Sequence, residues 1–275
     1  MLCAVMYTSW RHIPSFQVLI TLLAALVCLG GNDPGPEASV LETLDAAFRA
    51  RYELDLSSDV RLTIRDKAGT VQERQLRVVS KLIDSHLNSL IRLSHPAYLR
   101  DMTLLTIEGQ GRGHDTVIYL PSLQKVRRIT TSQKGDSFFG SDVTYEDLER
   151  LRVANFDVGG LSEEMRGGEA VYLIEARPKR KTTYARVVFV IAKSDYAILE
   201  THYYKRDQEE PFRIYTAPRE AMITEDGHVI PTRLRVVDKI RRSSTDIEFT
   251  NLKINPPLDD RLFSVRTLES KRPLP

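Results

Sequence analysis

Ser137 has the surroundings that come nearest to those of a catalytic group, because it stands in the sequence Gly135-Asp136-Ser137-Phe138. A serine nucleophile needs a general base within hydrogen-bonding reach. Enzymes with such a Gly-Asp-Ser block supply the base from an Asp-x-x-His pair near the C-terminus, and this sequence has no such pair. The block also does not follow a strand that opens an α/β domain. We therefore predict a structural loop around Ser137 and no enzyme activity.

Two other patterns that often hold ligands are incomplete. Residues 109–113 read Gly-Gln-Gly-Arg-Gly, but they lack the glycine spacing, the strand–loop–helix context and the lysine of a phosphate-binding loop. A hairpin turn explains them better. The histidines, at positions 12, 86, 95, 114, 202 and 228, include no two at helical ligand spacing. The sequence predicts neither a metal site nor a cofactor.

The charge and cysteine content argue against several classes of protein. The chain has 39 basic and 37 acidic residues, and Arg11 carries the single charge among the first 31 residues. The remainder is therefore close to neutral, which does not favour a nucleic-acid partner. Both cysteines, Cys3 and Cys28, lie in the same N-terminal stretch. A domain that begins after residue 31 consequently has neither a disulfide nor a cysteine metal site.

Residues 1–31 have the pattern of an export signal. An apolar run at residues 16–31 follows Arg11 and ends in small residues. It is shorter than the roughly 20 apolar residues of a membrane crossing. We predict a cleaved signal peptide, with an uncleaved anchor as one alternative and acylation of Cys28 as another, although the bulky Val27 disfavours acylation. Residues 32–275 then form one exported domain.

The first element of this domain is predicted to be a helix that runs to about residue 52. Ser39 and Glu42 have the spacing of a capping box at a helix N-terminus. Apolar residues at helical spacing form one stripe, made of Val40, Leu44, Ala47 and Phe48. Such a stripe is suited to packing across a sheet.

From residue 60 onward, the apolar period changes to two, which is typical of strands with one buried face. The predicted strands lie at residues 60–65, 76–78, 89–93, 102–108, 116–120, 125–129, 171–176, 185–192, 197–204, 212–216, 220–224, 229–233, 234–240 and 245–254. Strands this frequent, joined by short turns, predict a mainly β fold with a large antiparallel sheet or barrel.

Residues 145–151 do not fit the alternation and are predicted to be helical. Leu148 and Leu151 fall on one side of this helix and acidic residues on the other, and Asp142 is expected to cap it. A curved single-layer sheet leaves its concave apolar face exposed unless helices or a ligand cover it. We expect the helix to pack over that face.

Residues 119–148 carry the most specific pattern in the chain. It combines Tyr119-Leu120-Pro121, Lys125-Val126-Arg127-Arg128, Phe138-Phe139-Gly140-Ser141-Asp142 and Tyr145-Glu146-Asp147-Leu148. This block resembles the signature of the LolA-like outer-membrane lipoprotein-sorting proteins, and residues 227–233 and 249–264 are similar to the closing strands of that family. The resemblance implies a single curved antiparallel sheet that forms a half-barrel of about eleven strands, with lid helices on the concave face.

The resemblance also implies a function. It indicates a non-catalytic periplasmic carrier or accessory protein that binds the acyl chains of a lipoprotein or lipid for transfer toward the outer membrane. The implied partners are that acylated ligand and an inner-membrane transporter of the RND type. The alternative is a lipid-sensing regulatory protein of the same fold that acts on such a membrane partner. We expect a monomer in either case.

Seven residues of the signature and of the helix that follows it are expected to contact the ligand: Tyr119, Arg127, Arg128, Phe138, Phe139, Leu148 and Leu151. Phe138 and Phe139 either cover the concave face as a displaceable lid or form ordinary core that seats their loop. One of the two arginines should point outward, toward a lipid phosphate or a partner carboxylate, or else form a salt bridge to Asp136 or Asp142.

Overall fold

The computed structural model describes residues 36–111, 113–270 and 272–275. The predicted leader, residues 1–31, and both cysteines lie outside the described residues. The helices are α1 (Pro36–Tyr52) and α2 (Val265–Leu268). The strands are β1 (Leu56–Arg65), β2 (Val71–Ile83), β3 (His86–His95), β4 (Thr103–Glu108), β5 (His114–Leu120), β6 (Lys125–Arg128), β7 (Phe156–Arg166), β8 (Glu169–Pro178), β9 (Arg186–Ala192), β10 (Ile198–Tyr204), β11 (Arg213–Thr216), β12 (Met222–Glu225), β13 (His228–Pro231), β14 (Arg233–Asp238) and β15 (Ser243–Ile254).

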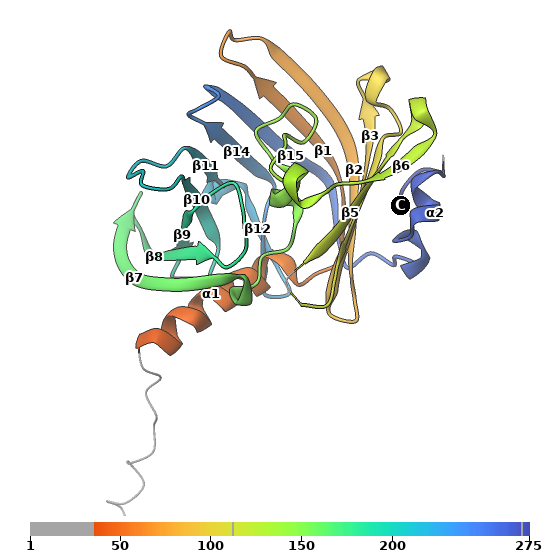
Figure 1. Cartoon of the computed structure of the whole chain (residues 1–275). Coiled ribbons are helices and arrows are strands. Elements are labelled where there is room, and N and C mark those ends of the chain that lie inside the picture. Colours follow the sequence, from red (N-terminus) through yellow and green to blue (C-terminus); the bar gives the residue numbers. More distant parts are fainter. Residues whose placement is uncertain (1–35, 112, 271) are drawn as a thin grey trace, which may run out of the picture. The chain divides into compact units, whose positions relative to one another are not determined.

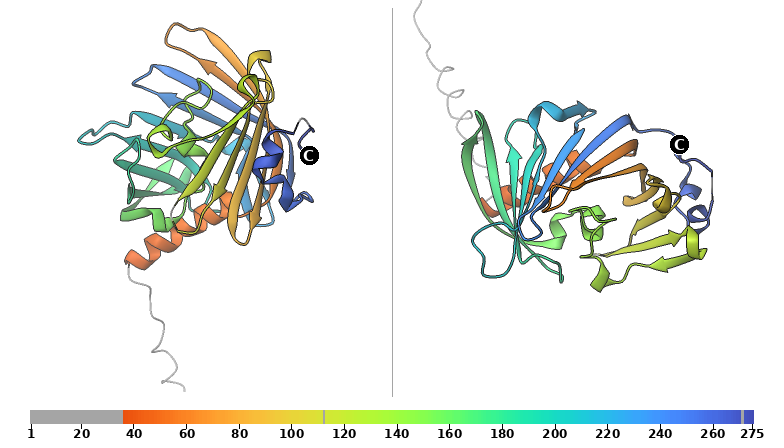
Figure 2. Two further views of the ribbon diagram at one scale, coloured as in Figure 1. Left: turned by 45° about the vertical axis from the view of Figure 1, so that its right-hand side comes forward. Right: turned by 90° about the horizontal axis from the view of Figure 1, so that it is seen from above.

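Thirteen of these strands form one antiparallel sheet, in the order β6-β5-β4-β3-β2-β1-β15-β14-β11-β10-β9-β8-β7. The strands β12 and β13 form a separate hairpin. The large sheet curves strongly and does not close, so β6 and β7 remain its two edges (Figures 1 and 2). The predicted half-barrel is confirmed, but its sheet has thirteen strands instead of about eleven.

The period of two in the sequence separates the two faces of the sheet. Leu76, Ile91 and Leu104 belong to one apolar cluster, whereas their neighbours Leu90 and Leu105 belong to another. Side chains alternate between the faces of a strand, so the two clusters lie on opposite faces. The first cluster lies on the concave face. The C-terminal residues, including those of α2, contribute to the second cluster, and α2 lies outside the curve in Figure 1.

The helix α1 covers one part of the concave face. Its predicted stripe is buried, since Leu44 is fully buried and Phe48 is 3% exposed. Phe48 makes tilted or edge-to-face contacts with Phe156 of β7 and Phe189 of β9. The helix ends at Tyr52 as predicted, but it begins at Pro36, one turn before the predicted capping box at Ser39.

The chain between β6 and β7 covers another part of the concave face, and we call residues 129–155 the inner segment. Figure 2 shows it inside the curve of the sheet. The predicted helix at residues 145–151 is only a 3-10 helix, Tyr145–Leu148. It ends there because Glu149 is extended, and the carboxylate of Glu149 is buried among basic side chains on neighbouring elements. The inner segment and α1 are the two elements that cover the concave face.

Candidate ligand-binding site

A cavity of about 210 Å³ lies on the concave face, between the apolar cluster under α1 and the apolar cluster under the inner segment. Tyr215 of β11 packs against both clusters and lines the cavity. Most of the lining side chains are apolar or aromatic, and they come from strands on both sides of the sheet centre: Val60, Leu62, Leu76, Val78, Ile91, Phe189, Ile198, Leu199, Tyr203, Leu234, Ile247 and Phe249.

Four of the predicted ligand-contact residues lie at this cavity or beside it. Phe138, Leu148 and Leu151 line the cavity. Phe138 is 3% exposed, and its ring contacts the rings of Phe139 and Tyr145 at centroid distances of 4.7 and 5.9 Å. Phe139 is partly buried against the same cluster. The structure therefore gives Phe138 the burial of a core residue as well as contact with the cavity.

The other three predicted residues lie away from the cavity. Tyr119 packs with Val126 in the apolar cluster of the outer face. Arg128 is on the same face and forms an exposed ion pair with Asp115 at 2.9 Å, so its partner is neither of the two acids expected. Arg127 pairs in register with Ile118, which places it on the concave side of the edge strand β6, where it is exposed.

A buried ion pair beneath the inner segment was not predicted from the sequence. Arg213 of β11 contacts Asp147 at 2.9 Å, and their side chains are 3% and 6% exposed. The hydroxyl of Tyr215 donates to the same carboxylate at 2.8 Å. Burial by itself lowers the pKa of Arg213, but the facing charge of Asp147 outweighs it and keeps the pKa above the usual range. This pair fixes the 3-10 helix to β11 of the sheet.

A second buried acid, Glu149, holds the end of the same 3-10 helix. Its side chain is 1% exposed and forms ion pairs with Lys134 and Arg180. The Nδ1 atom of His114 lies 3.4 Å from the same carboxylate. Burial by itself raises the pKa of Glu149, but the hydrogen bonds from His114, Lys134 and Arg180 outweigh it and lower the pKa to about 2. Glu149 is therefore ionised over the physiological range, and it links the inner segment to His114 of β5 and to Arg180 of the β8–β9 connection.

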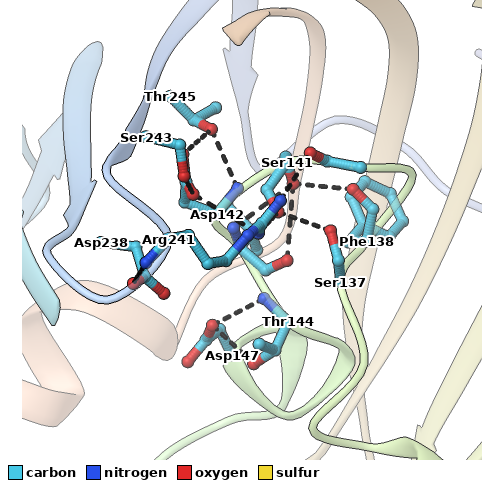
Figure 3. Close-up of polar contacts among 12 residues, drawn as sticks. Ser137, Phe138, Ser141, Asp142, Thr144, Asp147, Asp238, Arg241, Ser243 and Thr245 are labelled. Carbon is cyan, nitrogen blue, oxygen red and sulfur yellow. Dashed lines mark hydrogen bonds and ion pairs between the residues drawn. The ribbon is translucent and has the colours of Figure 1, made fainter. Parts of the chain in front are cut away.

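Asp142 anchors the middle of the inner segment, and it does not cap the 3-10 helix as expected. Figure 3 shows its carboxylate accepting hydrogen bonds from the hydroxyls of Ser243 and Thr245, with Arg241 at 3.4 Å. The cap is instead Thr144, whose backbone N–H and hydroxyl both donate to Asp147 at 2.7 and 2.6 Å. Asp142 is drawn toward β15 because the side chains there supply two donors.

The structure places Ser137 in a loop contact. Its hydroxyl donates to the carbonyl of Ser141 at 2.5 Å, in the same tight turn that seats Phe138. The strands β4 and β5 are joined by a tight connection, as predicted, in which Gly109 N–H donates to the carbonyl of Gly113 at 2.9 Å. Over the residues that the structure covers, no group of histidine, cysteine or carboxylate side chains is arranged to hold a metal ion, and no helix is long and apolar enough to cross a membrane.

The same half-barrel is present in several solved structures. A domain assigned to the outer membrane lipoprotein-sorting proteins, from Vibrio parahaemolyticus, has a TM-score of 0.78 at 20% identity, covering 84% of this chain and 98% of that chain. A DUF1329 family protein from Desulfovibrio piger has a TM-score of 0.78 at 28% identity, with coverage of 85% and 99%. A LolA superfamily protein from Nitrosomonas europaea has a TM-score of 0.65 at 18% identity, with coverage of 83% and 97%.

A protein-family model described as an uncharacterized protein matches residues 86–270, which is more than half of the chain. The chain belongs to the family that this model describes, and its fold is that of the LolA-like proteins. No curated protein sequence matches it. The resemblance of residues 119–148 to the LolA-like signature is thus confirmed by the fold.

The polar groups that line the cavity of this LolA-like protein mostly have partners of their own. Glu200 contacts Arg166 and His202 at 2.7 and 2.6 Å, and Asp147 contacts Arg213. Burial raises the pKa of Glu146, which accepts a hydrogen bond from a threonine hydroxyl. Satisfied polar groups leave the apolar surface as the main feature that the cavity offers a ligand.

Proposed function

We propose that this protein is a non-catalytic carrier or accessory protein that binds acyl chains of a lipoprotein or lipid in the cavity on its concave face. The observation that supports this most strongly is the cavity itself, which has an apolar lining and lies under two covering elements. Burial of an acyl chain contributes about 0.8 kcal/mol per methylene, so an apolar concavity supplies affinity without any reactive group.

The size of the cavity implies that ligand entry moves a covering element. Pockets that enclose a small-molecule ligand usually measure roughly 300–1,000 Å³, and this cavity measures about 210 Å³. The inner segment is tied to the sheet by the acids Asp142, Asp147 and Glu149, whereas α1 is held mainly by apolar contacts. We therefore expect α1 to move more readily than the inner segment when a ligand enters, although Phe138 of the inner segment also lines the cavity.

The proposed location is the periplasm. The family of lipoprotein-sorting proteins and the pattern of residues 1–31 both support export. A carrier in this compartment takes its ligand from the inner membrane, and the proposed partner is an RND-type transporter there. The proposed working form is a monomer.

Binding to the cavity can be tested with a variant that fills it. Val78 of β2 lines the cavity, whereas Val71 on the same strand is 53% exposed. Val78→Trp should lower the affinity for a fluorescent fatty acid at least tenfold, because the indole occupies the space of the acyl chain. Val71→Trp adds the same ring outside the cavity and should bind like the parent protein.

Titrations of both variants with the fluorescent fatty acid decide whether the acyl chain occupies this cavity, and thermal melts establish that each variant is folded. Equal affinities for Val78→Trp and Val71→Trp would show that the acyl chain does not occupy this cavity. Mass spectrometry of lipids that co-purify with the native protein identifies the natural ligand in the same material.

A further inference from the structure

Six connections between strands lie at one end of the sheet, and we call them the basic rim. The strand register places them there together: Arg65 pairs with both Val71 and Ser244, and Asp238 pairs with Arg213. The basic rim consists of residues 66–70, 96–102, 121–124, 179–185, 205–212 and 239–242. Its β1–β2, β14–β15 and β3–β4 connections lie along the upper edge of the sheet in Figure 1.

Charge is strongly segregated between the two ends of the sheet. The six connections of the basic rim carry ten basic and five acidic residues. The described residues of the connections at the opposite end include two basic and seven acidic residues, at 53–55, 84–85, 109–111, 113, 167–168, 193–197 and 217–232. The chain as a whole has a formal charge of only +2. The charge is therefore unevenly distributed between the two ends of the sheet, although the total is small.

Several cations of the basic rim have no acidic partner. Lys67, Lys181, Arg206 and Arg242 are exposed and, as far as the structure describes the chain, none of them is within ion-pair distance of a carboxylate. Their positive charge is therefore available to an anionic surface. By contrast, Arg241 is used within the fold, where it contacts Asp142.

Exposed apolar side chains stand beside these cations at the tips of the rim. Ile240 is 60% exposed in the β14–β15 turn, between Lys239 and Arg241, and Val71 is 53% exposed at the start of β2. Tyr98 and Leu123 are 74% and 51% exposed in two further connections. Cations next to exposed apolar side chains suit the interface of an anionic bilayer.

We propose that the basic rim docks this protein on a bilayer surface that carries anionic lipid headgroups. The proposal extends the proposed function, because it names the surface from which an acyl ligand is collected. Arg180, Thr182 and Tyr184 belong to a rim connection and also line the cavity, so docking through the rim brings one wall of the cavity to the membrane surface.

The test measures binding of the protein without residues 1–31 to vesicles by co-flotation. Vesicles of phosphatidylcholine alone are compared with vesicles that also contain phosphatidylglycerol. The variant Lys67→Gln/Lys181→Gln/Arg206→Gln/Arg242→Gln removes the unpaired cations of the rim. Its matched control, Arg49→Gln/Arg61→Gln/Lys253→Gln/Arg266→Gln, makes the same change in net charge at exposed positions outside the rim.

The parent and the control should bind the anionic vesicles and release them between roughly 0.01 and 1 M salt, because screening shortens the range of the attraction. The rim variant should bind at least tenfold more weakly, and its affinity for a fluorescent fatty acid should be unchanged. Equal binding to neutral and anionic vesicles, or an equal loss in the control, would overturn the proposal. Fatty-acid binding by the parent protein without vesicle binding would overturn the docking role alone and leave the carrier function in place.

Discussion

Phe138 connects the stability of the protein to its cavity at the scale of a single residue. Its ring is 3% exposed, packs on two other aromatic rings and lines the cavity. We expect Phe138→Ala to lower the free energy of unfolding by about 3–5 kcal/mol, since it removes a buried ring and leaves a void. Denaturant titration measures this loss.

Two control substitutions make the Phe138 prediction specific. Leu123→Ala, at a side chain that is 51% exposed, should change the free energy of unfolding by no more than about 0.5 kcal/mol. If Phe138→Ala melts like the parent protein, Phe138 is a displaceable cover and not part of the core. Phe139→Ala should cost less than Phe138→Ala, because Phe139 is only partly buried.

Glu149 gives the protein a pH-dependent component of stability. Its pKa is about 2 in the folded protein and 4.5 without the fold, so its folded pKa is depressed. The stabilisation, about 3 kcal/mol, is fully present above pH 4.5 and is lost as the pH falls from 4.5 to about 2. Glu149→Gln should therefore be less stable than the parent protein at pH 7, and the difference should shrink in acid.

Denaturant titrations of the parent and Glu149→Gln across this pH range measure the difference. A gap in stability that stays constant from pH 7 down to the limit of folding would mean that the ion pairs with Lys134 and Arg180 do not hold Glu149 ionised. The exposed acid Glu220, whose side chain is 72% exposed, is the control site, and Glu220→Gln should lower the free energy of unfolding at pH 7 by less than about 1 kcal/mol.

The inner segment depends on buried charge at the scale of an element. Asp147→Asn keeps an oxygen that accepts from Thr144 and Tyr215 but removes the charge that faces Arg213. We expect it to lower the free energy of unfolding by roughly 3–5 kcal/mol, because an unpaired guanidinium stays buried. Asp45→Asn breaks the exposed pair with Arg49 and should cost less than about 1 kcal/mol.

The double variant Asp147→Leu/Arg213→Met separates charge pairing from packing. Replacement of both buried charges by apolar residues is often close to neutral, so this variant should recover much of the stability lost in Asp147→Asn. If the double variant is as unstable as Asp147→Asn, its own loss comes from the hydrogen bonds that Thr144 and Tyr215 donate to Asp147, because leucine has no oxygen to accept them.

The same elements show what the sequence could predict. Strands with one buried face were found because their apolar residues alternate, as at Val60, Leu62 and Ile64. The strand β7 was missed, because it is an edge strand in which only Phe156 is buried and the residues from Glu163 to Met165 are exposed. An edge strand without a buried stripe has no period to detect.

Less of the candidate site than of the sheet could be predicted from the sequence. Phe138 and Leu148 were found through their place in the LolA-like signature, and Leu151 through its helical spacing from Leu148. The partners of Asp147 and Glu149 were not found, because Arg213 and Arg180 come from distant parts of the chain. Charged residues in a sequence are usually solvated, so only the fold shows which of them are buried in pairs.

At the scale of the whole molecule, the position of the thiols predicts its redox behaviour. Cys3 and Cys28 both precede the described residues. A protein that begins at residue 32 should therefore have the same midpoint of thermal unfolding with and without a reductant, because it holds no disulfide. Determination of the native N-terminus by mass spectrometry checks the leader: retention of Met1 contradicts cleavage, and an acylated Cys28 identifies a lipoprotein.

The pairing of β1 with β15 has a consequence for the order in which the sheet assembles. On either side of this seam, strands pair mainly with close neighbours in the chain, from β1 to β6 and from β7 to β15. The seam itself joins Val60 to Phe249, and contacts so distant in sequence form slowly. Each half can form as a series of hairpins, but the concave face is complete only when β15 has paired with β1. A ribosome-bound or partly translocated chain that lacks β15 thus has two half-sheets and no binding site, so the protein gains the capacity to hold a ligand only after its last strand is released.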